Sequence, residues 1–279
     1  QGQYAVALGE TAGHNSQGEY AVSIGKEAGK TAQGADAIAI GYKAGEQTQD
    51  TRSIAIGQES GNTSQGYDSI AMGYRAGRGT QGNNSVGIGA YSGSIAQGVQ
   101  SVAVGAYSGY GTQSTGAVAV GYQAGATVQG SGSIAIGYQA GEGTQGSDAI
   151  AIGPDSGFAS QGSNGISIGH DSGRTAQGAA SIAIGHQAGG ATQGADSIAI
   201  GKGAGQTSQG SGAIAIGELA GANGQGANSI VINASGLALS GTTANKFYVK
   251  PIASGSDTTN PLYYDTLTGE IYYVGGKGA

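Results

Sequence analysis

Three histidines are the residues of this 279-residue chain best suited to acid–base or metal chemistry. His170 and His186 stand sixteen residues apart, and His14 stands alone in the first part of the chain. Catalysis requires several polar groups in a fixed mutual relation, and we recognise no carboxylate or thiolate partner at ligand spacing from these histidines. Cysteine is absent altogether. We therefore expect no catalytic site, no metal site and no bound cofactor.

The abundant glycines do not form a phosphate-binding loop. A string such as GSGSIAIG, at 130–137, lacks both the Lys-Ser/Thr pair and the following helix of such loops. Charged residues make up 10% of the chain, the net charge is −6 and no basic patch occurs, so we expect no nucleic-acid partner. No apolar run approaches the ~20 residues that span a bilayer, so we expect no membrane insertion by this segment.

Tyrosines recur at positions whose neighbours vary freely. Exposed tyrosine offers a large contact area at a low entropic cost and is common on binding surfaces. One interpretation is that these are turn residues that stack on each other. The alternative is a multivalent contact surface for a host-surface glycan or protein. The candidate contact residues are Tyr42, Tyr74, Tyr91, Tyr107, Tyr122 and Tyr138.

All of these residues are carried by a repeat of sixteen residues. A small-apolar-small-apolar-Gly motif runs from 5–9 to 213–217, and a last version at 229–233 ends in Asn233. Alternation with period two predicts a short, half-buried strand, and the apolar residues are nearly all β-branched. We expect their side chains to stack as the core. This core ladder includes Ile38, Ile40, Ile54, Ile56, Ile134, Ile136, Ile182 and Ile184.

Two glycines and one glutamine are fixed in the second part of each repeat. Gly41, Gly45 and Gln49 illustrate the spacing, and fourteen copies share the second glycine and the glutamine. The glycines allow tight bends or positive φ. A glutamine at a constant position can donate to the next coil and accept from the previous one. The predicted structural ladder is Gln17, Gln33, Gln49, Gln65, Gln81, Gln97, Gln113, Gln129, Gln145, Gln161, Gln177, Gln193, Gln209 and Gln225.

The period predicts an all-β fold, a parallel β-roll or β-solenoid of about fifteen coils over residues 1–233. One repeat cannot bury its own apolar pair, so coils must stack. Strands ~4.8 Å apart would give a rod of roughly 70 Å. The residues between the apolar positions are almost always Ala, Ser or Gly, which indicates a close neighbour. A second copy of the chain is the simplest candidate, so we expect an oligomer.

Residues 234–279 are predicted to be a separate linker and C-terminal β cap. The small, polar stretch 234–244 is interpreted as a linker, 247–252 as a strand, and 262–265 with 270–274 as a hairpin. The open end of a solenoid needs covering. The alternative is a receptor-binding tip or a docking piece. The candidate cap or assembly residues are Phe247, Tyr248, Tyr263, Tyr264, Tyr272 and Tyr273.

The repeated SIAIG, AVAVG and SVAVG motifs resemble the head repeats of trimeric autotransporter adhesins, over residues 4–233. The resemblance implies a left-handed parallel β-roll in which three chains associate. The period of sixteen is longer than the roughly fourteen typical of that family, and no heptad stalk is visible. The tail segments NKFYVKPI and PLYYDTLTGEIYYV resemble segments near the C-termini of viral and phage fibre proteins.

These features favour an extracellular structural or adhesive protein and not an enzyme. Our leading hypothesis is a homotrimeric shaft or head of a viral or phage fibre that mediates surface attachment. The runner-up is a bacterial surface adhesin head. A third hypothesis is a structural filament whose rods join end to end. The expected partners are other copies of the chain and a host-surface glycan or protein.

Overall fold

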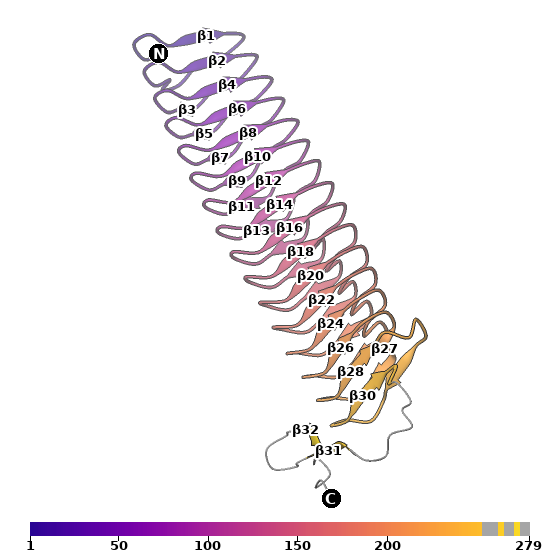
Figure 1. The fold of residues 1–279 in the computed structure, drawn as a ribbon. Helices are drawn as coiled ribbons and strands as arrows, with labels where there is room; N and C mark the ends of the chain where they lie inside the picture. The colour runs from indigo at the N-terminus through magenta and orange to yellow at the C-terminus, as the bar shows by residue number, and fades with distance from the viewer. Residues whose placement is uncertain (253–261, 265–270, 274–279) are drawn as a thin grey trace, which may run out of the picture.

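The computed structural model describes residues 1–252, 262–264 and 271–273, and residues 1–250 form one rod of stacked coils (Figure 1). The strands of the regular coils have three residues on one side of the rod, from β1 to β26, and two residues on the other side, from β3 to β25. All sheet pairs along the rod are parallel, and no helix occurs among the described residues. The predicted parallel β-solenoid of about fifteen sixteen-residue coils is confirmed.

The two sides of the rod are two long sheets. Sheet A has sixteen strands: β1 (Val6–Leu8), β2 (Val22–Ile24), β4 (Ile38–Ile40), β6 (Ile54–Ile56), β8 (Ile70–Met72), β10 (Val86–Ile88), β12 (Val102–Val104), β14 (Val118–Val120), β16 (Ile134–Ile136), β18 (Ile150–Ile152), β20 (Ile166–Ile168), β22 (Ile182–Ile184), β24 (Ile198–Ile200), β26 (Ile214–Ile216), β28 (Ile230–Asn233) and β30 (Phe247–Lys250). Sheet B has fourteen: β3 (Ala32–Gln33), β5 (Thr48–Gln49), β7 (Ser64–Gln65), β9 (Thr80–Gln81), β11 (Ala96–Gln97), β13 (Thr112–Gln113), β15 (Val128–Gln129), β17 (Thr144–Gln145), β19 (Ser160–Gln161), β21 (Ala176–Gln177), β23 (Thr192–Gln193), β25 (Ser208–Gln209), β27 (Ala220–Gln225) and β29 (Leu239–Gly241).

Strand pairing follows the sixteen-residue period without a slip over the regular coils. Ile38 pairs with Ile54 in sheet A, and Gln49 pairs with Gln65 in sheet B. Each residue therefore lies over the residue at the equivalent position of the next coil, and similar side chains form rows along the rod. This register is what turns a short sequence motif into a continuous surface.

The fixed glycines have two separate structural reasons. Gly41 ends its strand with a φ of +128°, and Gly45 bends the following turn with a φ of +54°. A Cβ on Gly45 would also lie 2.7 Å from Oε1 of Gln49, closer than real Cβ contacts allow. The constant Gly-x-x-x-Gln spacing is thus a packing requirement, because the glutamine amide fills the space that a side chain at the glycine would take.

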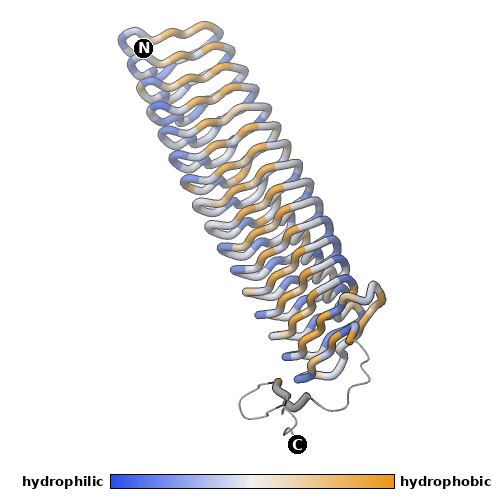
Figure 2. The backbone as a smooth tube through the Cα atoms, viewed as in Figure 1, coloured by the Kyte–Doolittle hydropathy of each residue, from blue (hydrophilic) through white to orange (hydrophobic). Residues whose placement is uncertain are grey.

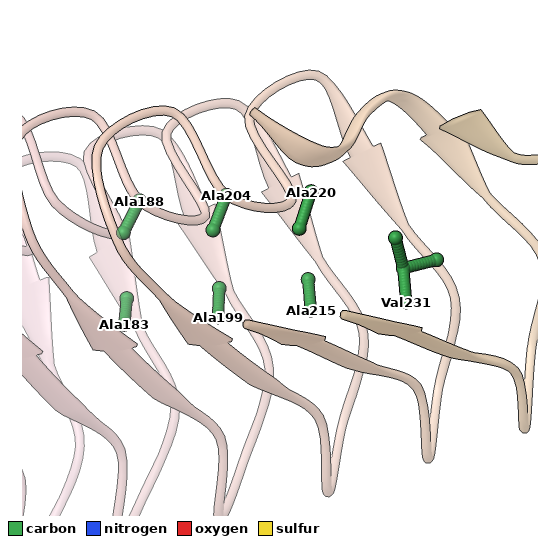
Figure 3. Packing of buried hydrophobic residues seen from close by; sticks show 7 residues of the cluster. All are labelled: Ala183, Ala188, Ala199, Ala204, Ala215, Ala220 and Val231. Atoms are coloured by element: carbon green, nitrogen blue, oxygen red, sulfur yellow. The ribbon is translucent and has the colours of Figure 1, made fainter. Parts of the chain in front are cut away.

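The interior of the rod is filled by alanine, serine and glutamine. Ala39 and Ala55, the middle residues of β4 and β6, are 0% exposed. Figure 3 shows the same arrangement near the C-terminal end, where Ala183 of β22 points toward Ala188 of the following turn, and Ala199 toward Ala204. The small residues therefore face the opposite wall of their own chain, and our expectation that a second copy approaches them is wrong.

The predicted core ladder lies on the outside of sheet A. Ile136 is 39% exposed and Ile184 is 36% exposed, and the other members are only partly buried. Alternation with period two separates two faces of a strand but does not say which face is inside. In the regular coils the inward residue of each sheet A strand is Ala, Ser or Gly, so only small side chains of this sheet face the opposite wall there. The expectation is wrong for Ile38, Ile40, Ile54, Ile56, Ile134, Ile136, Ile182 and Ile184.

The rod continues beyond residue 233, so the stretch 234–244 is not a linker. Within it, β29 extends sheet B, and after it β30 extends sheet A at the predicted strand. The inward row of sheet A changes from Ala215 to Val231 and then to Tyr248. The partly buried Tyr248 and Leu239 pack on the buried cluster that contains Val231. The larger side chains fill the end of the roll, as expected for a cap.

The predicted hairpin is present as an antiparallel pair, β31 (Leu262–Tyr264) with β32 (Ile271–Tyr273), in which Tyr263 pairs with Tyr272. The expected turn at 266–269 lies outside the described residues. So do the side chains of Tyr263, Tyr264, Tyr272 and Tyr273, on which the expected cap or assembly role depends.

A Tyr248→Ala variant should loosen the C-terminal end of the rod without affecting the distant coils. The partly buried ring covers Val231, and we expect a local loss of about 2 kcal/mol. Since each coil contacts mainly its neighbours, hydrogen exchange should accelerate in β28 and β30 and stay unchanged in β4 and β6. Tyr67→Ala, at an exposed turn, is the matched control. Unchanged protection of β28 in the Tyr248 variant would contradict the capping role.

Candidate interaction surfaces

The outer face of sheet A, here called the apolar face, is the largest uniform surface of the rod. It consists of the first and third residues of each strand from Val6 to Val249, and all of them are apolar. Figure 2 shows this face as a hydrophobic band that follows the whole length of the rod. With strands ~4.8 Å apart, the band is roughly 70 Å long. Contiguous apolar surfaces of this size mark interaction sites in soluble proteins.

The outer face of sheet B has the opposite character. Its outward residues in β5, β9 and β17 are Thr48, Thr80 and Thr144, and those in the other regular two-residue strands are Ala, Ser or Thr, except Val128. Threonine and serine suit a strand surface that faces water. The two sides of one rod are thus chemically distinct, and only sheet A presents large apolar side chains along its length.

The glutamine row lies inside the rod and ties its walls together. Gln129 is 0% exposed, and its Nε2 donates to the carbonyl oxygens of Val118 at 2.7 Å and Ser133 at 3.4 Å. The bond to the carbonyl eleven residues earlier recurs for all fourteen glutamines, from Gln17 to Gln225.

Hydrogen bonds between neighbouring glutamines are less regular than the bonds to the walls. Gln113 Nε2 donates to Gln129 Oε1 at 3.1 Å, and four further pairs make the same bond. Other oxygens have no partner, such as Oε1 of Gln81, or accept from a serine, as Oε1 of Gln177 does. The amides therefore bind mainly to backbone carbonyls of the opposite wall. The continuous ladder of glutamine–glutamine hydrogen bonds expected from the sequence is interrupted.

Most of the candidate contact tyrosines lie together on the turn that follows sheet A. The rings of Tyr91 and Tyr107 stack with centroids 5.0 Å apart, and those of Tyr122 and Tyr138 stack at 5.5 Å. Tyr42 is separate, because a coil that carries Gln58 lies between it and Tyr74. We call the contiguous group the aromatic strip. It comprises Tyr74, Tyr91, Tyr107, Tyr110, Tyr122 and Tyr138.

Charged pairs between neighbouring coils border the aromatic strip. Arg75 Nε lies 2.9 Å from Glu59 Oε2, Arg78 Nε lies 3.0 Å from the same oxygen, and the Arg75 guanidinium lies 5.0 Å from the centre of the Tyr74 ring. Burial raises the pKa of Glu59, but the hydrogen bond from Arg75 and the two positive charges outweigh it, so that the pKa is lowered. Glu59 therefore remains ionised, and its one carboxylate lies between two guanidinium groups, so the ion-pair network beside the strip keeps one excess positive charge.

Two histidines and an aspartate lie close together on the corresponding turns of two later coils. The rings of His170 and His186 stack with centroids 5.3 Å apart and an interplanar angle of 9°. Asp171 Oδ2 lies 3.1 Å from His170 Nδ1, and one ligand atom from each of the three residues lies within 4.8 Å of the others. We call these three residues the histidine cluster.

Asp171 is a carboxylate partner of these histidines, so the expectation that they lack one is wrong. The available signal was the His-Asp pair at 170–171, one repeat before His186. The third histidine does not join the cluster, because the ring of His14 instead contacts Asn15 Oδ1 at 2.8 Å.

A family model for the YadA head domain repeat matches residues 32–60 and 113–140. Two segments of the chain thus match YadA head repeats. Each matched segment includes two strands of sheet A and the intervening turn and sheet B strand, so the YadA head repeat corresponds to the stacked coil itself. This confirms the resemblance to trimeric autotransporter adhesin heads.

The other comparisons are less informative. A search of the curated proteins finds no match. The resemblance of the tail to viral and phage fibre proteins receives no support from the YadA head match and stays a hypothesis. No helix in the described part of the chain is long and apolar enough to cross a membrane.

Proposed function

We propose that the chain is the adhesive rod of an extracellular surface fibre, in which three copies pack through their apolar faces. The observation that carries the proposal is the uniform apolar character of the outer face of sheet A, opposite a polar outer face on sheet B. The YadA head repeats support an adhesin-like fibre, since heads of that type are trimeric and exposed at the surface.

Packing the apolar faces together supplies enough energy for association. The most exposed outward isoleucines of sheet A keep 36–39% of their surface exposed in the single chain, and the others keep less. Burial of this remaining area is worth roughly 1 kcal/mol for each of the most exposed side chains. Summed over the two outward residues of every sheet A strand, it outweighs the ~4–15 kcal/mol that association costs. The single chain has no equivalent core of its own, because its interior holds mainly alanine and glutamine. The apolar face supports this choice of interface, and the match to YadA head repeats supports an assembly of three chains.

Among the candidate settings, the YadA head match favours a bacterial adhesin head over the viral or phage fibre that the sequence analysis placed first. The third hypothesis, a filament of rods joined end to end, has no specific supporting observation. The adhesive role rests on the aromatic strip, because its rings are partly exposed and lie on a turn, outside both sheets.

A variant with Tyr107, Tyr122 and Tyr138 all replaced by Ala should lose adhesion. Beads coated with the chain are tested against a panel of immobilised glycans and host-surface proteins. Loss of three partly exposed aromatic contacts should weaken binding to the captured ligand at least about tenfold. Tyr67→Ala, on the opposite turn and similarly exposed, is the control and should bind normally. Binding to no panel member, or equal binding by the triple variant, would count against the adhesive role of this surface.

A further inference from the structure

We propose that His170, Asp171 and His186 bind one transition-metal dication of the Zn²⁺, Cu²⁺ or Ni²⁺ class and thereby link two adjacent coils. The three residues offer two imidazoles and one carboxylate within 4.8 Å of one another. Imidazole nitrogen suits these borderline ions, whereas Ca²⁺ and Mg²⁺ require sites built mainly from oxygen.

The coil register positions the two imidazoles for shared coordination. His170 and His186 occupy equivalent positions in neighbouring coils, which the hydrogen bond from Gln187 N to His170 O at 2.9 Å holds in place. Two nitrogens at tetrahedral angles around one Zn²⁺ lie about 3.4 Å apart. Imidazole lone pairs lie in the ring plane, so the stacked rings must tilt out of their parallel arrangement and bring their ligand nitrogens closer by roughly 1–2 Å. Both side chains are exposed and can rotate about their torsions, so this movement does not disturb the coils.

Asp171 is already oriented for the third ligand position. Arg174 Nε holds Asp171 Oδ1 at 3.0 Å, which leaves Oδ2 beside His170 Nδ1 at 3.1 Å. A metal ion between Nδ1 and Oδ2 takes the place of the proton that these two atoms can share. The ion pair with Arg174 then acts as an outer partner that fixes the carboxylate, and water completes the coordination.

The surrounding charges do not oppose a dication. Lys202, one coil beyond His186, is paired with Glu218 at 3.1 Å, and Arg174 is paired with Asp171 itself. Asp155 occupies the position of Asp171 in the preceding coil and adds a negative charge on the neighbouring turn. The bound ion would join neighbouring coils and stabilise the rod by mass action, because the ligands come together only in the folded chain.

The test is a calorimetric titration of the tag-free full-length chain with Zn²⁺, repeated with Ni²⁺. We expect one ion per chain, and His170→Ala and His186→Ala should each weaken binding at least about tenfold. Asp171→Asn should also weaken it. His14→Ala is the matched control and should bind as the unsubstituted chain does, since His14 lies outside the histidine cluster.

A second measurement separates a specific site from general ion binding. Excess Zn²⁺ should raise the melting temperature of the unsubstituted chain and of the His14→Ala variant, but not that of the His170→Ala variant. Electron paramagnetic resonance of bound Cu²⁺ should show two nitrogen donors, reduced to one in His186→Ala. Full-strength binding by His170→Ala, equal loss in His14→Ala, or displacement of Zn²⁺ by millimolar Ca²⁺ would overturn the proposal.

Discussion

A chain carrying both Val120→Lys and Ile136→Lys is expected to sediment as a monomer where the unsubstituted chain sediments as a trimer. Both residues are outward members of adjacent sheet A strands on the apolar face. Association would bury the new ammonium groups away from water, at a cost of several kcal/mol per uncompensated ion. Three chains would also bring six such charges close together. The assembly should therefore weaken at least about a thousandfold.

Val128→Lys is the matched control for this prediction. Val128 is 42% exposed on the outer face of sheet B, so it tests the same chemical change on the opposite side of the rod. Its lysine should remain in water, and the control should keep the mass of the trimer. Dissociation by both variants would show that added charge acts non-specifically, and a trimer in the double variant would place the interface elsewhere.

The second large effect should come from replacing a buried glutamine with an apolar residue of similar size. In Gln129→Leu, the carbonyl of Val118 loses its 2.7 Å donor and that of Ser133 loses its 3.4 Å donor. The amide of Gln113 keeps its bonds to Val102 and Ala117. Each buried polar group left unpaired costs about 1–3 kcal/mol, so we expect a loss of about 2–4 kcal/mol. Denaturant unfolding measures the total, and hydrogen exchange should accelerate in β14 and β16.

Gln139→Leu supplies the control, because the same substitution is made on the outer turn of the neighbouring coil. Gln139 lies near the surface, where it donates to Gln123 Oε1 at 3.1 Å. Its positive φ of 52° is compatible with leucine, because Leu219 adopts a φ of 55° at the equivalent position. We expect a change of less than about 1 kcal/mol. Equal losses in the two variants would mean that the buried amide has no special role in joining the walls.

The sequence was a sufficient guide to the fold because the repeat is regular. Positions that recur every sixteen residues must stack. Gly45 and Gln49 keep their spacing because the Gln49 amide fills the space that a side chain at Gly45 would need. The end of the regular repeat was harder to recognise. Residues 234–244 lack the motif, yet backbone pairing of β29 with β27 carries the sheet through them. Backbone hydrogen bonds do not depend on side-chain type, so composition alone suggested a linker.

The orientation of the sheet A strands could not be derived from the alternation of Ile134, Ala135 and Ile136. In most single domains the larger apolar residues face inward. Here Ala135 is 0% exposed, the inward residues of the regular sheet A strands are all Ala, Ser or Gly, and the isoleucines face outward. The outward apolar pattern is therefore available for the proposed interface between chains. The histidine cluster was also missed, because the approach of Asp171 to the two histidines depends on the geometry of the turn.

The native molar mass of the unsubstituted chain tests the central claim most directly. Sedimentation equilibrium or light scattering of the full-length, tag-free chain should give three times the 26.9 kDa of one chain, independent of concentration over the micromolar range. Such a mass is the expected consequence of an apolar face on every coil of the rod. A stable, soluble monomer of 26.9 kDa would contradict the account, because the outward isoleucines and valines would then remain in water.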